Sequence, residues 1–344
     1  MNAPSPQRRV AHALGRAVAA LVALVLAATL MAAAASPAAA KSPAQDFPPM
    51  PRKCATKAEK IPQSPVVCYL NKFKKARATV VLWGDSHAWM MIPAVRKAAK
   101  NKNVNVVATV MGGCPPMDNK VSANDQVPAC FRSNAMALDL IQDIKQRDRS
   151  VRVILGGSWE RYLTAVAQND QSYTGQMGRE MKKAFPRLIA TLAKRGIATD
   201  VIGQAATVPA KVKKCKKSMD PYACSVPRSK ALKREKQTRQ WLVKKTRRLA
   251  GNRKPIDVNS KFCTKKVCYG KKQGTWTWFD DLHLSATRTR SLAGLVKPSV
   301  VKAIEANKPA ASEPDAPTDT NTDTGTGGGD SGGGCSIPIL CALG

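Results

Sequence analysis

A serine that could act as a nucleophile lies in a short polar turn. Residues 79–83 are apolar and rich in β-branched side chains without alternation, which is typical of a strand buried on both faces of a parallel sheet. The sequence Gly84-Asp85-Ser86-His87 follows, and residues 88–100 carry apolar side chains at helical spacing. Ser86 is therefore predicted between the C-terminal end of a strand and the N-terminus of a helix, where open α/β sheets place their sites.

A nucleophilic serine needs a general base, and the chain has only three histidines: His12, His87 and His283. His12 falls in a segment that we expect to be removed. His87 is adjacent to the serine but would point in a different direction. His283 remains as the candidate base, and Asp280 could orient its imidazole from within the same loop.

The sequences Gly84-Asp85-Ser86-His87 and Asp280-Asp281-Leu282-His283-Leu284-Ser285 resemble the first and last conserved blocks of the SGNH (GDSL-like) hydrolase family. They are most similar to the SGNH domains fused to membrane acyltransferases that O-acylate surface glycans. Three further stretches agree with that subgroup: residues 112–116 with Cys130, residues 153–162, which resemble a strand ending in Trp and Tyr, and the pair Cys263 and Cys268. The resemblance covers residues 50–306.

The resemblance implies a doubly wound, flavodoxin-like parallel sheet with helices on both faces, the three-layer α/β/α SGNH hydrolase fold. It implies Ser86, Asp280 and His283 as the catalytic triad, with Gly84, Asp85 and His87 completing the first motif. One departure concerns the oxyanion hole, because residues 156–159 stand where the wider family has a Gly-x-Asn-Asp block. The main-chain N–H groups of Ser86 and Gly113 are our candidate oxyanion donors, with Trp159 as a further candidate.

The rest of the chain alternates between strand and helix patterns. Strands are predicted at 103–111, 151–155 and 198–203, and helices at 131–145, 177–194, 229–249 and from Ser285 to about 304. This alternation of apolar strands with helices independently predicts a doubly wound parallel sheet.

The two ends of the chain differ from the middle in composition. Residues 1–40 have arginines, an uncharged apolar run and an Ala-x-Ala ending, which predict a secretory signal peptide; an uncleaved membrane anchor is the alternative. Residues 41–50 are expected to be a flexible lead-in, and residues 51–306 the SGNH domain. Residues 307–334 have the composition of a disordered linker, and residues 335–344 form a short cysteine loop.

Ten cysteines fit an exported protein with local disulfides. A metal site is disfavoured, because no Cys-x-x-Cys occurs, and no cofactor is expected. The cysteines fall into five close pairs: Cys54 and Cys68, Cys114 and Cys130, Cys215 and Cys224, Cys263 and Cys268, and Cys335 and Cys341.

The formal net charge of +33 is high for an exported chain. It favours adhesion to anionic surfaces such as wall polymers or acidic polysaccharide, although the lysines could simply be solvated. Residues 211–254 form a basic insertion, for which a wall-facing or substrate-guiding surface and an ordinary solvated helix are both open. No nucleic-acid partner is expected, because no nucleic-acid-binding motif accompanies the basic residues.

Together these features predict a secreted or cell-surface serine enzyme that transfers acyl groups on extracellular or cell-wall glycan. Water as acceptor would make it an acetylesterase, and a sugar hydroxyl would make it an O-acyltransferase that needs a membrane acyl-donor protein in trans. The alternative is a non-catalytic, basic wall-binding module. A second serine motif at residues 329–333 matches that of chymotrypsin-like proteases, but it lies in a glycine tract without the strand and helix that such a motif requires.

Overall fold

A five-stranded sheet forms the centre of the structure, a computed structural model that describes residues 45–55, 60–119, 128–147, 150–208, 225–249 and 254–307. The strand order is β1-β3-β2-β4-β5. Four strands are parallel, and β1 pairs antiparallel with β3 at one edge. The strands are β1 (Cys68–Tyr69), β2 (Ala78–Gly84), β3 (Val104–Val110), β4 (Val151–Gly156) and β5 (Ala198–Val201).

Some of the sequence-based predictions concern residues outside those described. These are the signal peptide, the first part of the basic insertion with Cys215 and Cys224, and the C-terminal linker and loop with Cys335 and Cys341.

The central strand β2 has the burial that its sequence predicts. All seven of its residues are buried, and it pairs with β3 on one side and β4 on the other. Val80 and Leu82 belong to one hydrophobic cluster, and Val81 and Trp83 belong to a second cluster. Because successive side chains of a strand point to opposite faces, both faces of the sheet are covered.

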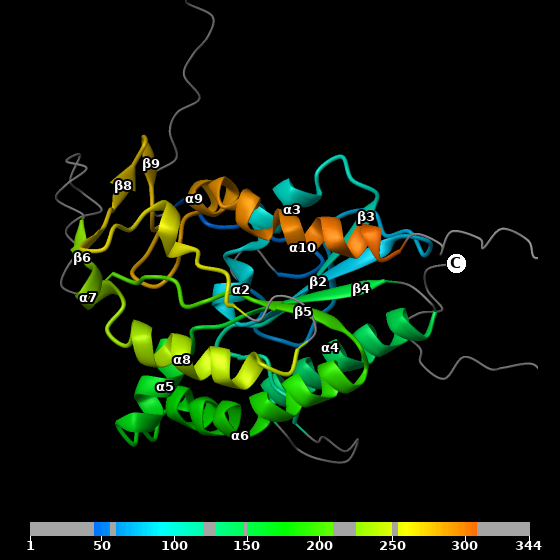
Figure 1. Cartoon of the computed structure of the whole chain (residues 1–344), viewed down its shortest axis with the longest axis horizontal. Coiled ribbons are helices and arrows are strands. Elements are labelled where there is room, and N and C mark those ends of the chain that lie inside the picture. The colour runs from blue at the N-terminus through cyan, green and yellow to red at the C-terminus, as the bar shows by residue number, and fades with distance from the viewer. Residues whose placement is uncertain are drawn as a thin grey trace, which may run out of the picture. The chain divides into compact units, whose positions relative to one another are not determined.

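Helices cover the two faces as the doubly wound prediction requires, which confirms the fold class (Figure 1). On one face lie α3 (Ile92–Ala99), α9 (Ala286–Ser291) and α10 (Ala293–Glu305). On the other face lie α4 (Ala129–Gln146), α5 (Trp159–Ala167), α6 (Tyr173–Lys194) and α8 (Glu235–Thr246).

The structure corrects several element boundaries. The single helix expected over 88–100 is two helices, α2 (Ser86–Trp89) and α3, because Pro93 in the first turn of α3 cannot donate to the Trp89 carbonyl. The helix expected over 229–249 is likewise divided into α7 (Arg228–Ala231) and α8. The strand expected to end in Trp and Tyr stops at Gly156, so Trp159 and Tyr162 lie on α5.

Short elements connect the sheet to the segment that carries His283. They are the 3-10 helix η3 (Asn259–Lys261), the pair β6 (Val226–Pro227) and β7 (Val267–Cys268), and the pair β8 (Lys271–Lys272) and β9 (Thr275–Trp276). Among the described residues, no helix has both the length and the apolar composition needed to cross a membrane.

Candidate active site

The candidate nucleophile Ser86 is the first residue of α2, and only Asp85 separates it from the end of β2 at Gly84. The turn depends on Gly84, whose φ of +147° is rare for a residue with a side chain. A Cβ atom at Gly84 would also lie 1.8 Å from the carbonyl oxygen of Gly156, at the end of neighbouring β4. The close approach of these two strand ends therefore requires glycine at position 84.

Asp85 joins the serine turn to the loop after β4. Its carboxylate is fully buried and accepts hydrogen bonds from the N–H of His87 at 2.7 Å and the N–H of Ser158 at 2.8 Å. The Tyr162 hydroxyl also hydrogen-bonds to it. Burial raises the pKa of Asp85, although these three donors oppose the shift. Asp85 thus fixes the position of Ser86 relative to the start of α5.

The Asp280 carboxylate contacts both the side chain and the main chain of His283. The two carboxylate oxygens lie 3.1 Å and 2.9 Å from His283 Nδ1, and the His283 N–H donates to Asp280 Oδ1 at 2.7 Å. The Leu282 N–H donates to the same oxygen at 2.9 Å. Burial alone would raise the pKa of Asp280, but the bonds to His283 and Leu282 outweigh it and lower that pKa. Asp280 is therefore well suited to orient the imidazole as an ionised carboxylate.

Three aromatic rings surround the His283 imidazole. Phe279 stacks on it with centroids 5.6 Å apart, Trp89 approaches edge-on at 5.8 Å, and the His87 ring lies 5.5 Å away. The Leu284 N–H also contacts the sulfur of Met90 at 3.4 Å. The structure thus brings the segment containing Asp280 and His283 onto α2, the helix that begins with Ser86.

The second imidazole nitrogen, His283 Nε2, is buried and has no hydrogen-bond partner within the described parts of the chain. The Ser86 to His283 hydrogen bond of a triad is therefore not formed in this substrate-free geometry. Catalytic hydrogen bonds of this kind often tighten only when substrate is bound. Nε2 is the ring nitrogen that Asp280 does not contact.

His87 is buried beside His283 and differs from it electrostatically. Burial lowers the pKa of His87 to about 3, and the neighbouring His283 and Arg161 add to the shift while Asp280 opposes it. His87 is consequently neutral at pH 7 and takes no proton there. The assignment of His283 as the base stays a prediction.

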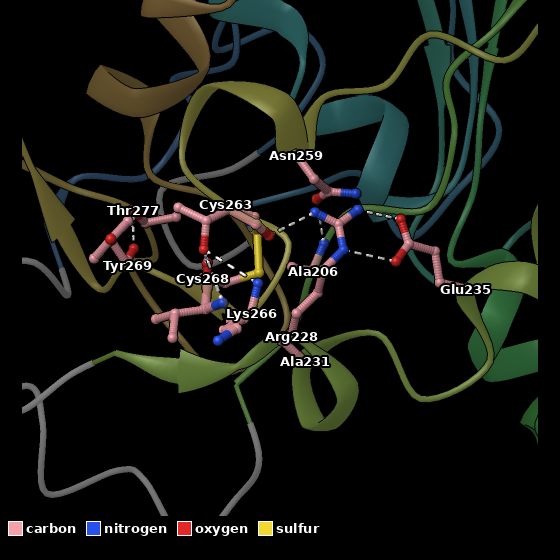
Figure 2. Close-up of a disulfide and its surroundings, with 12 residues drawn as sticks. Ala206, Arg228, Ala231, Glu235, Asn259, Cys263, Lys266, Cys268, Tyr269 and Thr277 are labelled. Carbon is pink, nitrogen blue, oxygen red and sulfur yellow. Dashed lines mark hydrogen bonds and ion pairs between the residues drawn. A yellow bond between two sulfur atoms is a disulfide. The ribbon is translucent and has the colours of Figure 1, made fainter.

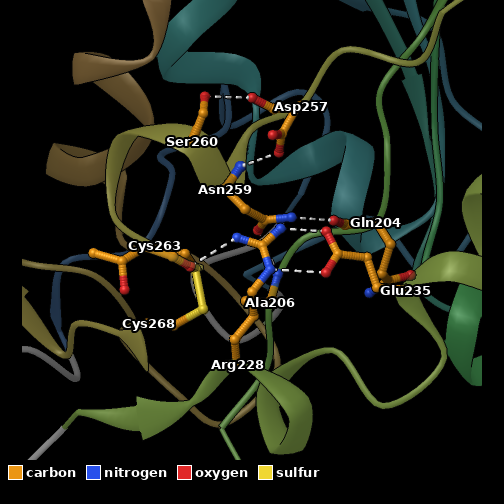
Figure 3. Close-up of polar contacts among 10 residues, drawn as sticks. Gln204, Ala206, Arg228, Glu235, Asp257, Asn259, Ser260, Cys263 and Cys268 are labelled. Carbon is orange, nitrogen blue, oxygen red and sulfur yellow. Dashed lines mark hydrogen bonds and ion pairs between the residues drawn. A yellow bond between two sulfur atoms is a disulfide. The ribbon is translucent and has the colours of Figure 1, made fainter. Parts of the chain in front are cut away.

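A polar network supports the segment that carries His283 (Figure 3). The buried Asn259 amide accepts from the Ala206 N–H at 2.8 Å and donates to the Gln204 carbonyl at 2.7 Å. The Ala206 carbonyl in turn accepts from the Trp278 indole at 2.8 Å. Asn259 thus fixes the chain after β5, which contacts the loop of residues 278–284.

The disulfide Cys263–Cys268 lies beside this network (Figure 2). The Arg228 guanidinium reaches the carbonyl of Thr264 within the disulfide loop at 3.1 Å and pairs with Glu235 at the start of α8. These contacts join the loop to α7 and α8, so part of the basic insertion helps to hold the region before His283.

The other described cysteines are in two states. Cys114 and Cys130 form a disulfide that closes the loop after Gly113. Cys54 and Cys68 are unbonded thiols, but they hydrogen-bond to each other, which raises the pKa of Cys68. Their pairing as a disulfide stays a prediction.

The candidate oxyanion donors differ in their surroundings. Met111 donates to the Gly84 carbonyl at 3.1 Å, which places the turn at Gly113 next to the serine turn. Gly113 has a φ of +66°, and its N–H has no acceptor among the described residues. The indole N–H of Trp159 donates to the Ile202 carbonyl, just after β5, at 2.8 Å. This side-chain donor is therefore already used within the protein.

Part of the expected lead-in contacts this site, which the sequence did not predict. Asp46 accepts from the Ala286 N–H through its carbonyl at 2.7 Å and from the Thr287 N–H through its carboxylate at 3.2 Å. Phe47 packs on Phe279 with centroids 6.2 Å apart. Residues 46 and 47 are thus anchored to the loop that carries the candidate base and to the helix that follows it.

Metal ligands do not gather here: no group of three or more His, Cys, Asp or Glu side chains with metal-binding geometry occurs in the described parts of the chain.

The geometry just described is a serine turn after a central parallel strand, with an Asp-His pair laid against the helix that begins with Ser86. Comparison with family models then gives the particular family. Residues 53–298 match the model described as "SGNH domain (fused to AT3 domains)", and the chain belongs to that family.

Among solved structures, the chain is similar to the periplasmic domain of a lipopolysaccharide acetyltransferase of Salmonella ser. Paratyphi A. The TM-score is 0.46 with 14% sequence identity, over 66% of this chain and 85% of that chain. No curated protein sequence matches significantly.

Proposed function

We propose that this chain is an acyl-transfer enzyme that acts on O-acyl esters of an extracellular or cell-wall glycan. The observation that carries the proposal is the Asp280–His283 pair, whose imidazole ring lies against Trp89 of the helix that begins with Ser86. Its Nε2 has no hydrogen-bond partner among the residues that the structure describes. Membership in the SGNH family adds support from an independent comparison.

In the proposed reaction, His283 Nε2 accepts the proton of Ser86 Oγ while that oxygen attacks the ester carbonyl. Main-chain N–H groups of Ser86 and Gly113 stabilise the oxyanion of the tetrahedral intermediate. The C–O bond to the leaving alcohol then breaks, and His283 returns the proton to that oxygen. The product is an acyl-serine. A second alcohol or water attacks its carbonyl carbon while His283 takes the proton of the attacking oxygen. The bond from the carbonyl carbon to Ser86 Oγ then breaks, and His283 returns the proton to Ser86.

The acceptor decides between the two activities. Attack by water makes the enzyme an esterase, and attack by a sugar hydroxyl makes it an O-acyltransferase. The family is described by its fusion to AT3 domains. This supports a membrane protein that supplies the acyl group in trans, as the second part of the proposal.

We place the activity outside the cytoplasm. Two disulfides close local loops, and disulfides persist mainly in oxidising compartments. The strongly basic composition would also favour contact with anionic surface polymers.

Hydrolysis of a short-chain chromogenic ester by the purified protein tests the chemistry. Ser86→Ala and His283→Ala should each abolish turnover, whereas Ser64→Ala, which alters an exposed serine, should retain it. Parallel reactions with an added sugar acceptor should reveal acylated sugar if the enzyme is a transferase.

The same experiment can contradict the proposal. Turnover by the parent that is no higher than by Ser86→Ala, with or without sugar and with or without membranes containing an acyl donor, would remove the enzyme interpretation. Retained glycan binding by Ser86→Ala under those conditions would favour the non-catalytic binding module.

A further inference from the structure

A groove of about 680 Å³ runs along α3, on the face of the sheet covered by α9 and α10. Its lining extends from Ile92 at the start of α3 to Lys102 beyond the helix end. At a rise of 1.5 Å per residue, the eight residues of α3 span roughly 12 Å. We name this feature the α3 groove. Its length suits a section of a linear chain better than a single small ion.

Five cationic side chains line the α3 groove, and no acidic side chain does. They are Arg96, Lys97, Lys100, Lys102 and Arg290. Within the described part of the chain, none of the five forms an ion pair. Five like charges around one depression repel one another, so an anionic occupant would relieve an unfavourable arrangement.

The helix dipole of α3 explains only part of this cluster. Arg96 and Lys97 lie in the last turn of α3, where positive charge is favourable. Arg290, however, comes from α9, and Lys102 follows the helix by three residues. Cations from separate elements therefore converge on the groove.

The floor of the groove is apolar. Leu70, Ile92 and Val106 are buried beneath it, and Pro49 and Pro93 add further carbon surface. A ligand suited to this lining has several negative charges and also presents C–H surface. A chain of acidic sugars has both properties, whereas a bare phosphate chain has only the charge.

The groove is connected to both halves of the candidate active site. α3 follows directly from α2, which begins with Ser86, and Arg290 lies seven residues after His283. α3 and α9 also pack against each other. A chain lying in the groove would thus rest on the two helices that follow the two catalytic motifs.

We propose that the α3 groove binds a linear acidic glycan. The inference extends the proposed function by giving the polymer a place on the surface, but binding itself requires no chemistry at Ser86. The two proposals can therefore fail separately.

The test compares two variants of equal charge change. The first replaces Arg96, Lys97, Lys100 and Lys102 with glutamine in the groove. The control replaces Lys236, Arg239, Lys244 and Arg247 with glutamine, all four being exposed residues on or just after α8. The probe is fluorescently labelled oligogalacturonate, a carboxylated sugar chain, with an uncharged galactan oligomer and inorganic polyphosphate as comparisons. Binding is measured in the Ser86→Ala background, with thermal unfolding as a check on folding.

We expect the groove variant to bind oligogalacturonate about tenfold or more weakly than the parent, and the α8 control to bind within about twofold. Galactan should not bind, and polyphosphate should bind more weakly than oligogalacturonate and with less dependence on the groove.

Three results would overturn the inference. Equal loss in the groove variant and the α8 control would mean that the charge acts diffusely. Equally strong, groove-dependent binding of polyphosphate would mean that the groove recognises charge and not a sugar chain. Absence of oligogalacturonate binding by the parent at low ionic strength would remove the site altogether.

Discussion

Asp85 Oδ2 and the Ser158 N–H form a buried hydrogen bond of 2.8 Å between two neighbouring strand ends of the parallel sheet. The same carboxylate accepts the His87 N–H, so one side chain sets the distance between the serine turn and the start of α5. Each of the two N–H groups needs an oxygen acceptor from residue 85. Replacing Asp85 with asparagine, which has the same shape but only one acceptor oxygen, should therefore disturb the site.

Asp85→Asn should lower the free energy of unfolding by about 1–3 kcal/mol, because the amide NH₂ would face a main-chain N–H. Ester hydrolysis should fall with it, since Ser86 loses its tie to Ser158. Tyr162→Phe removes one donor and leaves the two main-chain bonds, so it should cost only about 1 kcal/mol. Denaturant unfolding and initial rates measure both effects. An Asp85→Asn protein as stable as the parent would show that these bonds do not hold the turn.

The buried His87 should make the protein sensitive to mild acid. Its folded-state pKa is about 3, against about 6.5 in an unfolded chain, so between these values the unfolded state binds the extra proton. Its contribution to stability is full above about pH 6.5 and is lost as pH falls towards 3, with a slope of at most about 1.4 kcal/mol per pH unit.

Urea unfolding at several pH values between 7 and 4 measures this slope, and His87→Gln should flatten it. Asp280 adds a loss only at lower pH, because its pKa lies below the usual value near 3.9. A parent and a His87→Gln protein with the same pH dependence would contradict the assignment of the proton to His87.

Gly84→Ala should be among the most damaging small substitutions in the chain. The added Cβ would meet the Gly156 carbonyl at 1.8 Å, and the φ of +147° would be strained, so we expect a loss of more than about 2 kcal/mol and of activity. Gly294→Ala is the matched control, because nothing lies within 4 Å of its Cβ position in α10. It should be neutral or stabilising by up to about 1 kcal/mol. Thermal unfolding measures both variants beside the parent. A Gly84→Ala protein that melts at the same temperature as Gly294→Ala would contradict the prediction.

Asn259→Ala should weaken the support of the His283 segment. It leaves the Ala206 N–H and the Gln204 carbonyl buried without their partner, at a cost of about 1–3 kcal/mol for each group (Figure 3). Activity should fall because Ala206 also holds Trp278. Ser260→Ala, an exposed neighbour that bonds only to Asp257, should change stability by less than about 0.5 kcal/mol. Similar unfolding midpoints for the two variants would argue against a supporting role for Asn259.

Much of the fold could be predicted because its signals are local. The strands β2, β3 and β4 are mainly apolar and rich in β-branched residues, although β3 contains Asn105 and β4 contains Arg152. The helices α4 and α6 carry apolar side chains at regular spacing. The approach of the Asp280–His283 loop to α2 could be inferred from the resemblance of two short blocks, although these lie almost 200 residues apart.

The rest depends on contacts between distant residues, for which the sequence carries no local signal. β1 has two residues and is defined only by its pairing with β3. The break before α3 could have been found from Pro93. The α3 groove, by contrast, combines cations from two helices that meet only in the folded chain. The stacking of Phe47 on Phe279 had no sequence signature either.

The bonds between Asp46 and the start of α9 close a loop of 241 residues. The entropic cost of closing such a loop grows only slowly with its length. We expect the contact to form after the sheet between its two ends has folded, because the folded sheet brings those ends close together. During synthesis, Asp46 is made well before Ala286 and Thr287, so its hydrogen bonds to them form late. The contacts of residues 46 and 47 with the His283 region are therefore expected to form late in folding, after nearly the whole domain has been synthesised.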